Sequence, residues 1–147
     1  MYSAIVVIFD GCNVRALRRA KTRCLRSIAR EGVFTFKCKS VLPSVTYTAH
    51  ASIVTGVYPE EHGIVGNCFY DRELNRIVDF DKVDANKYLL SRTVMERIEG
   101  TKLCVGEPFT KGCDVVVSKK EIQTKPLFMQ DIYACLLYTS PSPRDRG

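Results

Sequence analysis

The chain begins with an unbroken apolar run that predicts a buried strand. Residues 4–9 read AIVVIF, and no polar position interrupts their β-branched side chains. Such a run is typical of a strand that is buried on both faces of a parallel sheet. Asp10 and Gly11 end the run. Because ligands of open α/β sheets gather at the carboxyl ends of the strands, Asp10 is well placed to take part in chemistry.

Residues 13–30 have the periodicity of an amphipathic helix. Their apolar side chains recur at spacings of three, four and seven, and arginines occupy the other face. Asn13 is a suitable N-cap for this helix, and Gly32 is a suitable stop. Residues 33–39 alternate in a way that predicts a second strand. The order of strand, helix and strand predicts a βαβ unit.

The rest of the pattern predicts shorter elements that are separated by polar turns. They are a helix over 49–54, a hairpin that pairs 68–70 with 76–80, a helix over 89–98, and strands over 103–106 and 115–117. Strands that alternate with helices indicate an α/β fold. We therefore predict the N-terminal portion of a doubly wound, mostly parallel sheet, which this chain leaves incomplete.

The net charge of +6 is concentrated near the start of the chain. Nine lysines and arginines lie between residues 15 and 39, with Glu31 as the single acid. A solvated helix face accounts for most of them. Nucleic-acid binding is disfavoured, because no aromatic side chain lies among the basic residues of the predicted helix. A basic binding module without catalytic activity stays an alternative. No stretch approaches the roughly 20 apolar residues of a membrane span.

The seven cysteines include no C-x-x-C pair, which leaves a zinc ribbon or a thioredoxin-type site without support. Their odd number, without secretory features, argues against a disulfide framework. We interpret most of them as reduced, small core residues. No signal peptide is visible at the start, which favours a cytoplasmic location.

Residues 135–147 read CLLYTSPSPRDRG, which looks like the translated read-through of a sequencing adapter. Such adventitious segments are excluded from fold reasoning. We therefore expect residues 1–134 to be the native N-terminal part of a domain, and a natural Pro/Ser-rich tail is the alternative.

The most informative segment is 42–67, which follows the predicted strand that ends at Asp10. In order, it contains Pro43, Thr46, Thr55-Gly56, Tyr58-Pro59, His62-Gly63-Ile64 and Asn67. These residues, in this order, resemble the nucleophile region of the type I phosphodiesterases and nucleotide pyrophosphatases of the alkaline phosphatase superfamily. The resemblance covers 4–70 well and the rest weakly, and it implies an alkaline-phosphatase-like hydrolase domain.

The resemblance implies roles for four residues. Thr46 is the expected nucleophile, and Asp10 and Thr46 both bind one metal of a two-metal site in which zinc is expected. The backbone amide of Tyr47 and the side chain of Asn67 are expected to hold the phosphate oxygens. These roles are chemically consistent, because a threonine hydroxyl is a poor nucleophile until a divalent cation lowers its pKa. Backbone N–H groups at a helix start also favour an anion.

Some of these positions allow a second interpretation. The Tyr47 ring could stack on a nucleobase or be half-buried in the fold. His50 and His62 are the only histidines, and we expect both to be structural. Family members commonly carry Pro-Asn where this chain has Thr48-Ala49, a departure that blurs the substrate class.

We therefore predict a metal-dependent hydrolase of phosphodiester or pyrophosphate bonds, acting on a phosphate ester, a nucleotide or a phosphonate. The family takes its remaining metal ligands from later segments, and no histidine follows His62. This fragment alone is therefore expected to be inactive. Phosphonoacetate-hydrolase-like cleavage of a C–P bond is the alternative, for which the stretch 62–71 is suggestive.

Overall fold

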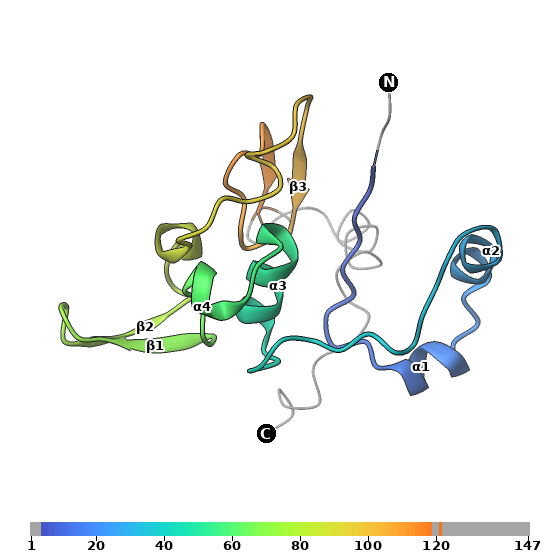
Figure 1. Cartoon of the computed structure of the whole chain (residues 1–147), viewed down its shortest axis with the longest axis horizontal. Coiled ribbons are helices and arrows are strands. Elements are labelled where there is room, and N and C mark those ends of the chain that lie inside the picture. The colour runs from blue at the N-terminus through green and yellow to red at the C-terminus, as the bar shows by residue number, and fades with distance from the viewer. Residues whose placement is uncertain (1–3, 119–120, 122–147) are drawn as a thin grey trace. The chain divides into compact units, whose positions relative to one another are not determined.

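The computed structural model describes residues 4–118 and 121, which form parts of two units (Figure 1). The first unit contains residues 4–39 of the described chain, and the second contains residues 40–118 and 121. The predicted adapter-derived tail, 135–147, lies outside the described residues.

The first unit contains two short helices where the sequence predicts one. Helix α1 spans Val14–Arg19 and helix α2 spans Arg23–Glu31. Asn13 caps α1 as predicted, because its side chain accepts a hydrogen bond from the backbone N–H of Ala16 at 2.8 Å. The predicted single helix is wrong at Ala20, whose ψ of 142° leaves the helical region and divides the segment.

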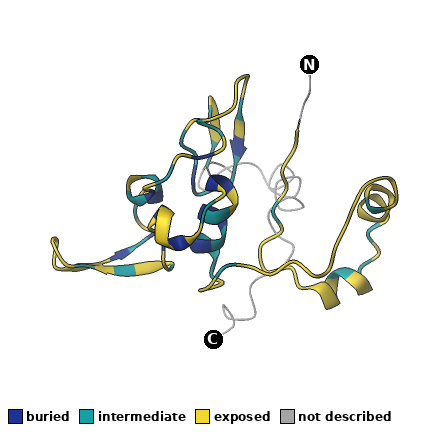
Figure 2. Cartoon of the chain, viewed as in Figure 1, coloured by how far each residue is buried: buried dark blue, intermediate teal, exposed yellow. Residues whose placement is uncertain are grey.

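Neither predicted strand of the first unit forms. Residues 4–9 and 33–39 contain no strand, and their apolar side chains are largely exposed, with Ile5 at 89% and Val33 at 101%. A strand exists only where a neighbour completes its hydrogen-bond ladder, and within the described residues neither segment has such a neighbour. Helices α1 and α2 bury no residue either (Figure 2). The described part of this unit therefore has no core of its own.

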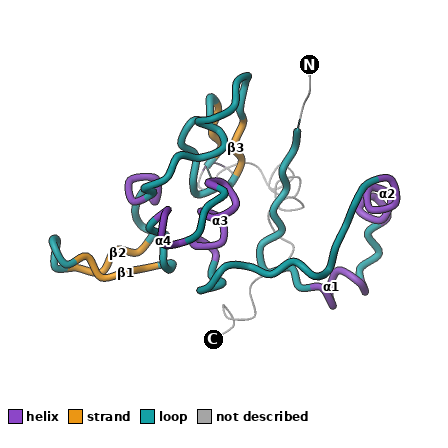
Figure 3. Tube along the Cα trace, in the orientation of Figure 1, coloured by secondary structure: helices purple, strands orange, loops and turns teal. Residues whose placement is uncertain are grey.

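The second unit is organised around helix α3, which spans Thr46–Thr55. The predicted helix over 49–54 is confirmed and begins three residues earlier. It ends at Gly56, whose φ of 74° lies in the left-handed region that favours glycine. Helix α4, Pro59–His62, follows at once and packs against α3 (Figure 3).

The predicted hairpin is confirmed. Strand β1 spans Cys68–Asp71, and β2 spans Arg76–Asp79, its antiparallel partner. The turn between the strands is stabilised by residues close in the sequence. Oδ1 of Asp71 accepts hydrogen bonds from the backbone N–H groups of Glu73 and Leu74, both at 3.0 Å.

The two later strands are also confirmed. Strand β3, Leu103–Val105, pairs in parallel with β4, Val115–Val117. In the described chain the sheets are therefore two separate two-stranded ladders, and the fold class is mixed α/β.

The predicted helix over 89–98 is wrong. A 3-10 helix, η1, spans Ala85–Tyr88 just before it, and the segment itself is turns and bends. Its backbone donors are used elsewhere: the N–H of Leu90 donates to the carbonyl of His62, and the N–H of Val94 to that of Val54. These tertiary bonds replace the ladder that a helix would need.

The core of the second unit lies between α3, the hairpin and the segment that follows η1 (Figure 2). Its buried members are Ala51, Val54, Ile64, Val78, Phe80, Ala85, Leu89 and Phe109. This core fixes α3 from one side, and α3 carries Thr46 and Tyr47, two of the residues with predicted chemistry.

The cysteines differ from the prediction. Cys104 and Cys113 form a disulfide, with their Cα atoms 6.2 Å apart. Among the other described cysteines, all are free, as predicted, but all are exposed rather than in the core: Cys12, Cys24, Cys38 and Cys68. The pairing of β3 with β4 brings Cys104 and Cys113 together, which no sequence motif signals. No helix in the described part of the chain is both long and apolar enough to cross a membrane.

Candidate functional site

The amino-terminal end of α3 carries the predicted nucleophile. Thr46 is the first residue of the helix and is half-buried. The preceding Val45 is extended and makes no side-chain cap. The first turn of α3 therefore presents backbone N–H groups that another part of the chain, or a ligand, must satisfy.

Asn67 satisfies one of these donors. The backbone N–H of Tyr47 donates to Oδ1 of Asn67 at 3.2 Å. Asn67 is exposed just before β1, and its backbone carbonyl accepts from the N–H of Phe80 at 3.0 Å, which holds it at the start of the hairpin. Since Oδ1 accepts from Tyr47, the donors of this side chain are the two hydrogens on Nδ2. The structure thus brings together the two predicted phosphate-binding groups.

The Tyr47 ring is packed into the fold. Its ring centroid lies 5.2 Å from that of Phe80 and 6.2 Å from that of Phe109. Its hydroxyl lies 2.9 Å from the carbonyl oxygen of Phe80 and 3.0 Å from Oδ1 of Asp81, two acceptors that share its proton. Burial and then the charge of Asp81 raise the pKa of Tyr47 far above its ordinary value. Of the two interpretations of this ring, the structure has the half-buried one.

His62 has the structural role that the sequence predicts. It is completely buried, and its Nδ1 accepts from the backbone N–H of Ile64 at 3.1 Å. The proton is therefore on Nε2, which donates to Oγ of Ser52 at 2.8 Å and joins α4 to α3. Burial lowers the pKa of His62 below 6.5, which keeps the ring neutral.

His50 also packs into the fold, as predicted. It lies one turn past Thr46 on α3, is only 9% exposed, and its Nδ1 lies 2.8 Å from Oε2 of Glu107. The neighbouring Thr48, at the position where this chain departs from the family pattern, is completely buried. The start of α3 is therefore fixed by contacts on more than one face.

Asp10 lies in a turn of the first unit, where it is exposed and is followed by Gly11 with φ of 68°. Thr46 belongs to the second unit. Within residues 4–118 and 121, no group of three or more histidine, cysteine or acidic side chains is arranged to hold a metal ion. The shared metal site of Asp10 and Thr46 stays a prediction.

The family resemblance of the motifs in residues 42–67 agrees with the comparison to known proteins. Over residues 4–142 the chain matches the family described as type I phosphodiesterase/nucleotide pyrophosphatase. The chain belongs to this family.

Individual relatives match a shorter stretch. An uncharacterized pyrophosphatase/phosphodiesterase of Schizosaccharomyces pombe is 42% identical over 69 residues, which are 47% of this chain and 14% of the relative. The human bis(5'-adenosyl)-triphosphatase ENPP4 is 40% identical over 67 residues, 46% of this chain and 15% of the relative. Rat ectonucleotide pyrophosphatase/phosphodiesterase family member 1 is 48% identical over 44 residues, 30% of this chain and 5% of the relative. The matched part of this chain is thus a small fraction of each family member's length.

Two residues of the site had no signal in the sequence. Glu107 reaches His50 from 57 positions away, and Asp81 reaches Tyr47 from 34 positions away. Neither acid belongs to a recognisable motif or a local periodic pattern. Only the tertiary structure identifies them as neighbours of α3.

Proposed function

We propose that the complete protein hydrolyses phosphodiester or pyrophosphate bonds with Thr46 as its nucleophile. The observation that carries the proposal is the convergence of the Tyr47 amide and the Asn67 side chain beside Thr46, at a helix start to which the preceding Val45 provides no side-chain cap. A helix start of this kind favours an anion. Family membership supports the same reaction class.

In the proposed reaction, the Thr46 hydroxyl releases its proton to solvent and attacks phosphorus, while the bond from phosphorus to the leaving group breaks and the leaving group takes up a proton. Water then hydrolyses the covalent phosphothreonine, which releases the phosphate product and regenerates Thr46. The Tyr47 N–H and the Nδ2 hydrogens of Asn67 donate to a non-bridging oxygen, on which negative charge develops. In the structure the Tyr47 N–H and the Asn67 side chain bond to each other. A bound phosphate oxygen would replace Oδ1 of Asn67 as the acceptor for Tyr47, so that both groups donate to it. Donors held beside the reacting phosphate stabilise the developing charge, and here the phosphate oxygen has only to displace Oδ1 of Asn67.

We propose that Asp10 and Thr46 contribute two ligands to a divalent metal site. The Asp10 carboxylate and the Thr46 hydroxyl are oxygen donors of the kind that such cations accept, and zinc is the proposed metal. When bound, the cation lowers the pKa of a coordinated hydroxyl and neutralises phosphate charge. We propose that the other ligands come from the remainder of the complete protein. The same remainder would complete a doubly wound sheet around residues 4–9, and without it this chain would be inactive.

The packed Tyr47 ring favours a small substrate as the second candidate. With its hydroxyl bound at Phe80 and Asp81, the ring is committed to the core of the unit. A phosphonate or a small phosphodiester needs no aromatic platform, and cleavage of a C–P bond thus stays a candidate beside nucleotide hydrolysis. The name of the human relative points to dinucleoside triphosphates as the nucleotide candidate.

The test uses the complete protein with Thr46→Ala and, as a matched control, Ser44→Ala. Ser44 is exposed two residues before the helix, and its change to alanine, like that of Thr46, removes a hydroxyl. We expect Thr46→Ala to abolish release of product from a p-nitrophenyl phosphodiester, a dinucleoside triphosphate and phosphonoacetate, while Ser44→Ala retains activity. Full activity of Thr46→Ala on any of these substrates would refute the assignment of Thr46 as the nucleophile. The substrate that the wild type cleaves fastest decides between the candidates.

A further inference from the structure

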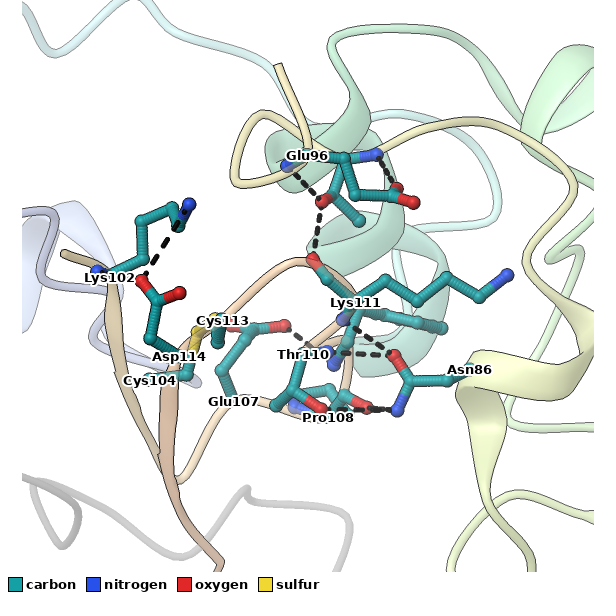
Figure 4. Close-up of a disulfide and its surroundings, with 12 residues drawn as sticks. Asn86, Glu96, Lys102, Cys104, Glu107, Pro108, Thr110, Lys111, Cys113 and Asp114 are labelled. Atoms are coloured by element: carbon teal, nitrogen blue, oxygen red, sulfur yellow. Dashed lines mark hydrogen bonds and ion pairs between the residues drawn. A yellow bond between two sulfur atoms is a disulfide. The ribbon is translucent and has the colours of Figure 1, made fainter. Parts of the chain in front are cut away.

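The segment between β3 and β4 is held unusually firmly for a loop. Residues 106–112, here the 106–112 loop, lie between Cys104 and Cys113, which the disulfide joins (Figure 4). Gly112, at φ of +83°, approaches the adjacent backbone so closely that an added Cβ would lie 2.6 Å from the nitrogen of Glu96. A side chain there would force the two segments apart.

A single amide side chain anchors the middle of the 106–112 loop. Oδ1 of Asn86 accepts from the N–H groups of Thr110 at 2.7 Å and Lys111 at 3.2 Å. Its Nδ2 donates to the carbonyl of Pro108 and to Oγ1 of Thr110, both at 3.3 Å (Figure 4). The buried Thr93 adds a hydrogen bond to the carbonyl of Lys111 at 2.7 Å. The backbone of the loop is thus bound from two separate segments.

The anchored loop presents one carboxylate to the nucleophile helix. Oε2 of Glu107 lies 2.8 Å from Nδ1 of His50, and Oε1 accepts from the N–H of Phe109 at 3.3 Å. Both oxygens of Glu107 are therefore engaged, and its position is set by the loop. His50 and Thr46 are four residues apart in α3, so they lie on the same face of the helix, one turn apart.

We propose that Glu107 is a positioning residue that acts through His50 to set the orientation of Thr46. Helix ends fray where their first N–H groups lack partners, and the residue before α3, Val45, provides no side-chain cap. The hydrogen bond of Asn67 restrains the Tyr47 amide, and the contact of Glu107 restrains the helix one turn later. Together these contacts restrain the first turn of α3, which carries the Thr46 hydroxyl. The inference rests on the proposed role of Thr46 as nucleophile.

The test compares Glu107→Ala with Glu107→Gln in the complete protein. Glutamine keeps an acceptor oxygen for His50, whereas alanine removes the contact. Asp114→Ala is the matched control. Asp114 is also a carboxylate beside the disulfide, but it binds Lys102 rather than a residue of α3. The readouts are kcat and KM on the best substrate, and hydrogen exchange of peptides that cover 44–50 and, separately, 68–80.

We expect Glu107→Ala to lower kcat by about tenfold or more, with KM changed by less than about twofold, because misplaced reacting groups slow the chemical step. Exchange should accelerate in 44–50 but not in 68–80. Glu107→Gln should recover most of kcat, and Asp114→Ala should leave kcat and the exchange of 44–50 unchanged.

Three outcomes would overturn the inference: an unchanged kcat in Glu107→Ala, an equal acceleration of exchange in both peptides, or a loss of kcat in Asp114→Ala as large as in Glu107→Ala. Failure of the underlying function is distinguishable. It would appear as activity in Thr46→Ala, whereas the exchange of 44–50 would still report whether Glu107 restrains α3.

Discussion

The backbone N–H of Tyr47 donates to Oδ1 of Asn67 across 3.2 Å, although 20 positions separate the two residues in the sequence. This bond joins the first turn of α3 to the start of the hairpin. It places an amide side chain beside the predicted nucleophile without any contribution from the first unit. The arrangement lets a substitution separate the structural role of Asn67 from its proposed role toward phosphate.

Asn67→Asp should retain the fold and lose activity. An aspartate keeps an oxygen that accepts from the Tyr47 amide, but it has no hydrogen to donate and it repels a phosphate. Removing one such donor costs about 10²- to 10³-fold in kcat in comparable sites. The measurement is kcat of the complete protein, together with a thermal unfolding scan. Unchanged kcat would show that Asn67 serves only the fold, as the acceptor for the Tyr47 amide.

The stability of the second unit should fall in mildly acidic solution because of His62. Its pKa in the folded state lies below the ordinary value of 6.5, so the unfolded chain takes up a proton first as the pH falls. The stabilisation is thus fully present above about pH 6.5 and is lost as the pH drops toward the folded-state pKa. Urea unfolding between about pH 8 and about pH 5 measures the slope.

The control for this pH dependence is His62→Asn, which removes the titrating ring. We expect the variant to be less stable at neutral pH, because Ser52 and Ile64 lose their partner. Its stability should also change less with pH. A slope equal to that of the wild type would assign the pH dependence to other groups.

Loss of the disulfide should destabilise the second unit. Cys104→Ser opens a loop whose ends are 9 positions apart, and loop-closure entropy puts the cost at about 2–3 kcal/mol. Cys68→Ser is the matched control, since Cys68 is free and exposed. Urea unfolding under oxidising conditions should separate the two variants, and a dithiol reductant should abolish the difference. Equal stability of the two variants before reduction would contradict the pairing.

Tyr47→Phe should cost about 0.5–1.5 kcal/mol, the usual net value of a hydrogen bond. The variant keeps the ring contacts with Phe80 and Phe109 and loses only the hydroxyl contacts with Phe80 and Asp81. Tyr58→Phe is a suitable control, because Tyr58 is 68% exposed. Equal unfolding midpoints for the two variants would show that the Tyr47 hydroxyl contributes nothing to the fold.

Local chemistry explains the elements that the sequence predicted correctly. Asn13 caps α1 with its own side chain, and Asp71 builds its turn with residues two and three positions away. Gly56 ends α3 because the left-handed conformation suits it. Each of these features depends on residues within one turn of the chain, so the pattern carries the information.

The wrong predictions concern segments whose structure depends on residues that are distant in the sequence. Residues 4–9 have the composition of a buried strand, but within the described residues they lack the neighbouring strand that would make them one. Residues 89–98 have helical periodicity, but Leu90 and Val94 donate to His62 and Val54 instead. Propensity and periodicity predict structure poorly where a distant partner offers better hydrogen bonds, or where the partner strand that a ladder needs is not present.

For the candidate site, the sequence by itself predicted which residues carry chemistry: Thr46 at a helix start, the Tyr47 amide next to it, and Asn67 after a glycine turn. The ordered motif is enough for this prediction, because family membership follows from the identity and spacing of side chains. Only the tertiary structure decided that Asn67 meets Tyr47, that the Tyr47 ring is packed, and that Glu107 supports His50. These contacts join residues 20 to 57 positions apart, and such distances are closed by the packing of the core rather than by any local pattern.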